Sequence, residues 1–246
     1  MNNERNVPLL VLNSIWQDVK YTRAALPKNI YSNTAIMYIA TSDLAQMEQR
    51  YRAALINSLG GFKSVVMIGS TDQEGHTNLA IFNSLFHIGA NPPLCGLIFR
   101  PDSVERHTLT NIEQTGAYTV NHLNEHIYQQ AHQTSARYPS TISEFEATGL
   151  TPLWQPGYIA PFVAESHLRF YLELQEKIPL TINGTILLIG KITGIWLPDG
   201  AVQSDGFVDI EKAGSLTCSG LDSYHRTQRI ARLSYAKTDT KPSIID

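Results

Sequence analysis

The chain has 246 residues, with 19 Lys and Arg against 22 Asp and Glu, so its formal net charge is −3. With 43% hydrophobic and 17% charged residues, it has the composition of a chain that buries a core and not of a disordered one. The near-neutral balance argues against a nucleic-acid-binding protein held by a basic surface.

Two cysteines, Cys95 and Cys218, are too few for a disulfide framework and fit a reducing compartment. No apolar run approaches the roughly 18–20 residues of a membrane-spanning helix, and the first residues lack the pattern of a signal peptide. We therefore expect a soluble, cytoplasmic globular protein with no nucleic-acid and no membrane partner.

The first part of the chain passes from an irregular lead-in to β-like segments. Residues 1–45 mix short apolar patches with turn-forming residues, and Asp43 is placed to cap a helix over residues 44–56. After Gly60-Gly61 the pattern predicts a strand over 64–71, a polar turn over 72–77 and a returning segment over 78–89.

The rest of the chain continues the β pattern with a few helices. After Asn91-Pro92-Pro93 it predicts a strand over 94–99, a helix over 101–115, a strand over 117–123, a polar helix over about 124–136 and a loop over 137–161. Two further strands, over 167–180 and 185–197, are joined by Asn183-Gly184, a strong hairpin signal. Strands outnumber helices and adjoin one another, which favours an antiparallel barrel over an alternating βαβ fold.

Two motifs with possible chemistry have simpler explanations. HLNEH at 122–126 fits the H-x-x-E-H pattern of inverted zinc peptidases, with His132 nearby as a further ligand. Zinc would need both imidazoles on one helix face, whereas His122 closes a strand-like segment, so we favour a solvated loop and helix. Cys95 lies in an apolar run and Cys218 has no adjacent histidine, so neither is a strong candidate nucleophile.

A more informative group of polar residues lies between residues 78 and 112. Asn83 and Ser84 stand between Phe82 and Phe86, and a basic and hydroxyl-bearing cluster surrounds the expected helix start: Arg100, Ser103, Arg106, His107, Thr108 and Asn111. Guanidinium groups and free N–H groups at a helix N-terminus can form an anion site without a glycine-rich loop, and none of the common phosphate-loop motifs is present. The alternative, a capped amphipathic helix with solvated arginines, is favoured on composition alone.

Several of these segments, taken in order, resemble a known family. NLAIFN (78–83), NPPL (91–94) and RHTLTNI (106–112) are similar to ordered motifs of the flavin reductase-like, FMN-binding split-barrel proteins, the group that includes flavoredoxin. The stretches 50–64 and 219–237 resemble the lead-in and the closing segment of one bacterial branch. The resemblance covers about residues 45–237, and it implies a mainly β fold, a six-stranded antiparallel split barrel, in a homodimer with flavin near the subunit interface.

The resemblance also implies the domain limits and the cofactor contacts. We expect an N-terminal extension over 1–45, the flavin reductase-like domain over 46–237 and a tail over 238–246. By position, Phe82, Asn83 and Ser84 would line the flavin ring, while Arg100, Arg106 and Thr108 would lie near the ribityl phosphate. Further contacts are expected from Lys63 and Ser64, and closure of the pocket from Tyr224, His225 and Arg226. Asn83 stands where many members have serine and His87 where proline is frequent, which makes the substrate less certain than the flavin.

Three functional hypotheses follow from the resemblance. The first is an oxidoreductase of the NAD(P)H:flavin reductase type, with FMN as cofactor and NAD(P)H as electron donor. The second is a flavoredoxin-like electron carrier reduced by a partner redox protein, and the third is a binding or structural dimer without an active cofactor. The basic run over 225–241 is either a solvated terminal face, which we favour, or a surface that attracts nucleotide phosphates.

Overall fold

The structure is a computed structural model that describes residues 37–101 and 106–246 of the chain. It divides into two compact units, residues 1–47 and 48–246. The expected extension over 1–45 therefore lies mostly outside the described residues. In the described part of the first unit, helix α1 (Thr41–Gln46) begins after Ala40, whose backbone N–H donates to the Asp43 carboxylate at 2.9 Å.

The single helix expected over residues 44–56 is wrong, because the backbone is extended at Met47 (φ −62°, ψ 143°) and α1 ends there. A second helix, α2 (Gln49–Leu59), begins after Glu48, whose side chain accepts a hydrogen bond from a first-turn N–H at 2.9 Å. The first N–H groups of a helix have no partner inside it, so a carboxylate at this position stabilises the start. Glu48, and not Asp43, therefore caps the longer helix.

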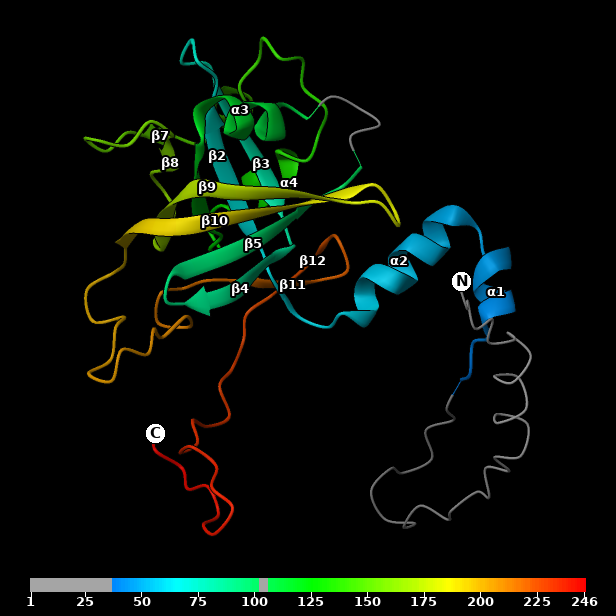
Figure 1. The fold of residues 1–246 in the computed structure, drawn as a ribbon, viewed down its shortest axis with the longest axis vertical. Helices are drawn as coiled ribbons and strands as arrows, with labels where there is room; N and C mark the ends of the chain where they lie inside the picture. Colours follow the sequence, from blue (N-terminus) through cyan, green and yellow to red (C-terminus); the bar gives the residue numbers. More distant parts are fainter. Residues whose placement is uncertain (1–36, 102–105) are drawn as a thin grey trace, which may run out of the picture. The chain divides into compact units, whose positions relative to one another are not determined.

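Seven strands form the main sheet, and all neighbouring pairs are antiparallel (Figure 1). Their order is β3-β2-β6-β9-β10-β5-β4. The strands are β2 (Val66–Thr71), β3 (Thr77–Phe82), β4 (Leu85–Ala90), β5 (Pro93–Phe99), β6 (Ala117–His122), β9 (Arg169–Leu180) and β10 (Thr185–Trp196). The expected hairpin β9–β10 is confirmed, and its turn ends at Gly184, which has a φ of 74° that other residues rarely adopt.

The returning segment expected over 78–89 is two strands, β3 and β4, separated by a corner at Asn83 and Ser84. The Asn83 amide donates to the Gly220 carbonyl at 3.0 Å, and the Ser84 hydroxyl donates to the Ile98 carbonyl at 2.8 Å. β3 and β4 are opposite edges of the sheet, yet only these two residues separate them. Three Cα–Cα steps span at most roughly 11 Å, so the edges meet and the sheet rolls into a partly open barrel. The main sheet has seven strands and not the expected six, because one predicted segment contributes two.

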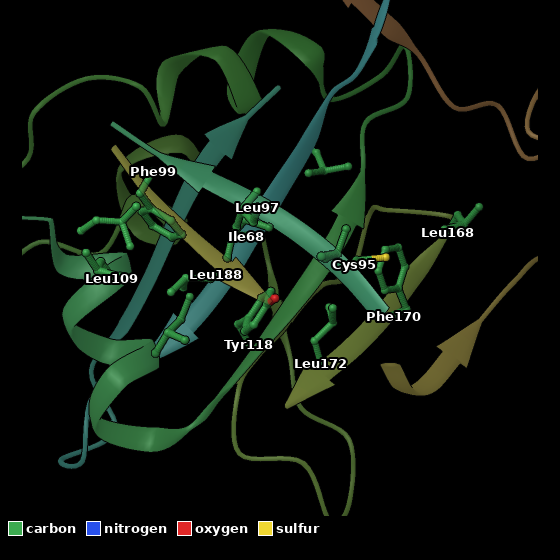
Figure 2. Close-up of a cluster of buried hydrophobic side chains, with 14 of the residues drawn as sticks. Ile68, Cys95, Leu97, Phe99, Leu109, Tyr118, Leu168, Phe170, Leu172 and Leu188 are labelled. Carbon is green, nitrogen blue, oxygen red and sulfur yellow. The ribbon is translucent and has the colours of Figure 1, made fainter. Parts of the chain in front are cut away.

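The interior of the barrel is filled by apolar side chains from strands that are distant in the sequence (Figure 2). Ile68, Leu97, Tyr118 and Leu188 come from four different strands and are all fully buried. Burial of a side chain of this size contributes about 1.5–3 kcal/mol relative to exposure. This core joins the strands into one rigid body against which the loops are positioned.

Helix α3 (His107–Thr115) packs on β2, so that all six residues of that strand are buried. The described helix begins later than the predicted range 101–115, and residues 102–105, with Ser103, lie outside the described residues. It ends as expected at Gly116, which has a φ of 74°. The start of α3 lies beside β3, where the Thr108 hydroxyl accepts a hydrogen bond from the Asn78 amide.

The segment expected as a helix over 124–136 and a loop over 137–161 contains more structure than predicted. It holds α4 (Tyr128–Gln133), α5 (Glu144–Thr148) and the paired short strands β7 (Pro152–Leu153) and β8 (Phe162–Val163). Ala131, Phe145 and Leu150 are buried in a second apolar cluster with Leu79 of β3. This tertiary contact stabilises helices that are too short to persist alone.

A small second sheet completes the fold, in the order β1-β11-β12. Its strands are β1 (Lys63–Ser64), β11 (Thr217–Ser219) and β12 (Ser223–His225). Across the described ranges 37–101 and 106–246, we find no helix with the length and apolar character that crossing a membrane requires.

Candidate functional site

A cavity of about 1020 Å³ lies where the ends of β3 and β5, the start of α3, the segment after α4 and the small sheet come together. Asn78 and residues 80–83 contribute from β3 and its corner, residues 98–100 from the end of β5, and Tyr224 from β12. Its lining combines apolar rings with amide, hydroxyl and guanidinium groups. That composition suits a ligand with a planar part and a charged part.

One end of the cavity is cationic and surrounds the start of α3. Arg106 occupies the position before the helix, and one of its terminal nitrogens donates to the Pro101 carbonyl at 3.2 Å. Its Nε is buried and has no hydrogen-bond partner among the described residues. Thr108 is buried beside it and accepts a hydrogen bond from the Asn78 amide at 2.8 Å. A buried N–H without a partner costs free energy, so this end is arranged to receive an acceptor, and an anion satisfies it best.

The other walls of the cavity near β3 are apolar and aromatic. Phe82 of β3 packs edge-on against Phe99 of β5 with ring centroids 4.8 Å apart. Ala80 and Ile81 of β3 and Val65, which precedes β2, also line the cavity. Cys218 lines this side as a buried thiol, and burial raises its pKa. A thiol of raised pKa is mostly un-ionised at neutral pH, so this wall presents an apolar surface to a planar ring.

Six of the eleven predicted contact residues line this cavity: Phe82, Asn83, Arg100, Arg106, Thr108 and Tyr224. The other five lie outside its lining and have hydrogen bonds or ion pairs elsewhere. The Lys63 ammonium donates to the Asn57 and Gly220 carbonyls at 3.0 Å each, and the Ser64 hydroxyl donates to the Leu85 carbonyl at 2.8 Å.

The remaining three of those five are also held by local partners. The Ser84 hydroxyl bonds the Ile98 carbonyl, His225 Nε2 lies 2.8 Å from the Ser219 hydroxyl, and Arg226 forms an ion pair with Glu125. Their side chains hold the corner and the small sheet in place. Their direct contact with a cofactor stays a prediction.

His132, residues 134–140 and Glu144 of α5 also line the cavity, although the sequence singled out none of them as a cofactor contact. His132 Nδ1 lies 2.7 Å from the Tyr224 hydroxyl, and burial raises the pKa of Tyr224 to about 12. Glu144 is buried, accepts a hydrogen bond from the Leu79 N–H at 2.9 Å, and has a pKa raised by burial. The only local signal for α5 was the S-x-x-E pattern from Ser143, which favours a helix start.

The histidines of the HLNEH motif lie on different elements, as expected. His122 ends β6, and His126 is exposed beyond the strand. His122 Nδ1 lies 3.1 Å from the Ser215 hydroxyl, and burial lowers the pKa of His122 to about 4. Through this contact with Ser215, His122 links β6 to the segment before β11.

The geometry defines a rolled antiparallel barrel with a cavity that is cationic at one end and apolar beside it. Residues 59–211 match the flavin reductase like domain, a match that spans more than half of the chain. The chain belongs to this family, and the resemblance inferred from the sequence is confirmed.

Solved structures agree with this assignment. A split-barrel protein assigned as a flavin reductase, from Shewanella frigidimarina NCIMB 400, is 51% identical and covers 81% of this chain and 100% of its own, with a TM-score of 0.79. Component B of nitrilotriacetate monooxygenase from Bacillus cereus is 22% identical over 81% of this chain and 100% of its own, with a TM-score of 0.71. Flavoredoxin of Desulfovibrio vulgaris (Miyazaki F) is 19% identical over 73% and 92%, with a TM-score of 0.59. The last two show a shared fold.

Proposed function

We propose that this protein is an FMN-dependent oxidoreductase of the NAD(P)H:flavin reductase type. The observation that carries the proposal is the buried Arg106 Nε at the cavity, which has no hydrogen-bond partner among the described residues. A phosphate would accept a hydrogen bond from this guanidinium group, and membership in the flavin reductase like family supports the choice of a flavin phosphate.

The residues present fit such a cofactor. Arg106 and Arg100 would hold the phosphate, and Thr108, already fixed by Asn78, would add a hydroxyl. Phe82 and its apolar neighbours would face the ring, and the amide of Asn83 would orient one ring edge. The buried thiol of Cys218 keeps that wall free of charge.

A bound flavin would supply hydride-transfer chemistry between a reduced nicotinamide and an acceptor. The chain would supply binding, orientation and electrostatics: Arg106 and Arg100 would hold the phosphate, and the apolar wall of β3 would exclude water from the ring face. No acid or base is needed to move a hydride. The absence of a catalytic dyad from the sequence motifs is consistent with this.

The decisive variant is Arg106→Gln, with Arg50→Gln on the exposed face of α2 as the matched control. A hydrogen bond to a charged group is worth about 1.5–3 kcal/mol, and 1.4 kcal/mol is tenfold in affinity. We expect the Kd for FMN, measured by fluorescence titration, to rise about 10- to 100-fold in Arg106→Gln and to stay unchanged in the control. Equal FMN affinity in the two variants would remove Arg106 from the phosphate site.

Steady-state oxidation of NADH and NADPH by the FMN-loaded protein separates the alternatives. Turnover of either donor supports the reductase. Tight FMN binding without turnover, relieved by a partner redox protein, supports an electron carrier, and no FMN binding supports a structural dimer. The homodimer stays a prediction, which light scattering after gel filtration tests.

A further inference from the structure

The wall of the cavity formed by residues 132–140 has a composition that the flavin phosphate site does not explain. Every residue from His132 to Ser140 except Gln133 lines the cavity. The stretch contains no Asp or Glu, and it carries the guanidinium of Arg137. The cavity therefore has a third guanidinium group besides Arg100 and Arg106, and it lies on a different segment of the chain.

Arg137 is available to a ligand. Its side chain is exposed at the cavity, and it forms no hydrogen bond and no ion pair with any other residue in the ranges the structure describes. On either side of it in the chain, Ser135 and Ser140 offer hydroxyl groups to the same space. Guanidinium with nearby hydroxyls is the donor set that phosphate prefers.

An aromatic ring stands next to this donor set. Tyr138 is partly buried on the same wall, and its hydroxyl accepts a hydrogen bond from the Gln133 amide at 3.0 Å. That bond engages the hydroxyl and not the π-face, and Tyr138 lines the cavity, where the ring could pack on a planar group of a ligand. Arginine followed directly by tyrosine thus presents a phosphate donor and a stacking surface side by side, which suits a nucleotide.

The wall is anchored to the rest of the domain before any ligand binds. Ala131 is fully buried in the second apolar cluster, and the buried Thr134 donates its hydroxyl to the Ala131 carbonyl at 2.8 Å. His132 is held to Tyr224 of β12 at 2.7 Å. A wall that is already ordered loses little entropy on binding, so its contacts contribute directly to affinity.

The cavity is large for a small-molecule site. Its volume of about 1020 Å³ stands at the upper end of the range for small-molecule sites, roughly 300–1,000 Å³. A cofactor phosphate at Arg106 leaves the wall at 132–140 without a function of its own. A reductase of this type must bring a second nucleotide to the ring of the first.

We propose that residues 132–140 bind the nucleotide portion of the hydride donor, with Arg137 contacting a donor phosphate and Tyr138 packing on its base. This inference rests on the proposed function, and it assigns a substrate-binding role to a segment outside the flavin phosphate site. Arg137 then determines the affinity for the donor, and Arg106 the affinity for FMN.

The test uses the FMN-loaded full chain with Arg137→Gln, and with Arg50→Gln as the matched control. Calorimetric titration with NAD⁺ and NADP⁺ measures donor binding without turnover, and steady-state oxidation of NADH and NADPH gives KM and kcat. We expect Kd and KM to rise about tenfold in Arg137→Gln, while kcat and the Kd for FMN stay within twofold of the control. Weaker binding of both dinucleotides assigns Arg137 to the pyrophosphate, and weaker binding of NADP⁺ alone assigns it to the 2′-phosphate. Either result supports the proposal.

A second pair of variants tests the ring. Tyr138→Leu should weaken dinucleotide binding severalfold, and Tyr138→Phe should retain it because the stacking face remains. Unchanged Kd and KM in Arg137→Gln, or an equal loss of FMN affinity in that variant, would overturn the inference. Failure of the proposed function is distinct, because it shows in the unmodified chain as no bound FMN or no oxidation of either donor.

Discussion

His122 makes the stability of this protein sensitive to acid. Burial lowers the pKa of His122 to about 4 from its ordinary value of 6.5. The ring lies near Phe170, and its Nδ1 is 3.1 Å from the Ser215 hydroxyl. Between these two pKa values the unfolded chain binds a proton that the folded protein does not. Stability is therefore fully present above pH 6.5 and is lost as the pH falls toward 4.

The size of this effect follows from the shift. A difference of 6.5 − 4 pKa units corresponds to about 3 kcal/mol at 1.36 kcal/mol per unit. About 1 kcal/mol of this is lost between pH 7 and pH 5.5, which for a chain of this length lowers Tm by roughly 2–4 °C. The non-titrating variant His122→Gln, whose amide can still bond Ser215, should lack this part of the acid loss.

The assay is urea unfolding of wild type, His122→Gln and the control His126→Gln at pH 7.0, 5.5 and 4.5. His126 is exposed, so its variant should lose stability with pH as the wild type does. The comparison is of the change with pH and not of absolute stability, which a core substitution alters for other reasons. The reasoning is refuted if His122→Gln and wild type lose stability equally as the pH falls.

Two further predictions concern the packing of the barrel. Tyr118 is fully buried, and its hydroxyl has no hydrogen-bond partner among the described residues. Tyr118→Phe should therefore raise the free energy of unfolding by about 1 kcal/mol, measured as a higher Tm in calorimetry. An unchanged or lower Tm would show that the hydroxyl is hydrogen-bonded. A Cβ at Gly190 would lie 2.2 Å from that hydroxyl and 2.9 Å from Leu172 Cδ2. Gly190→Ala should therefore lower the free energy of unfolding by about 1–3 kcal/mol. The double variant with Tyr118→Phe should recover part of this loss, and strictly additive effects of the two substitutions would contradict the contact.

Local signals in the sequence predicted the strands well, but they missed the points at which the structure divides one expected segment into two elements. Asn183-Gly184 specified a hairpin because only a turn with positive φ reverses two strands so tightly. The run over 78–89 was predicted as one segment, because its hydrophobicity continues across Asn83 and Ser84. Their side chains form hydrogen bonds with Gly220 and Ile98, residues far away in the chain, and these bonds make the corner. No local pattern contains such contacts.

The residues of the candidate site were likewise predicted only in part. The cationic end at Arg106 and Thr108 was suggested by the polar cluster at the expected helix start and by the family resemblance, and both residues line the cavity. Lys63 and Ser64 were predicted from the same resemblance, but their side chains donate to backbone carbonyls and lie outside the lining. A resemblance in sequence does not determine which face of a two-residue strand meets the cavity.

The sequence by itself determined the class of fold and the family, because alternating apolar residues, turn residues and ordered motifs are all local. The tertiary structure alone decided that the segment over 132–140, expected as the end of a helix and the start of a loop, lines the same cavity as α3. It also decided that β3 and β4, which follow each other in the chain, are the two opposite edges of the sheet. Both follow from the closure of a barrel, which brings together residues whose separation along the chain no local pattern can encode.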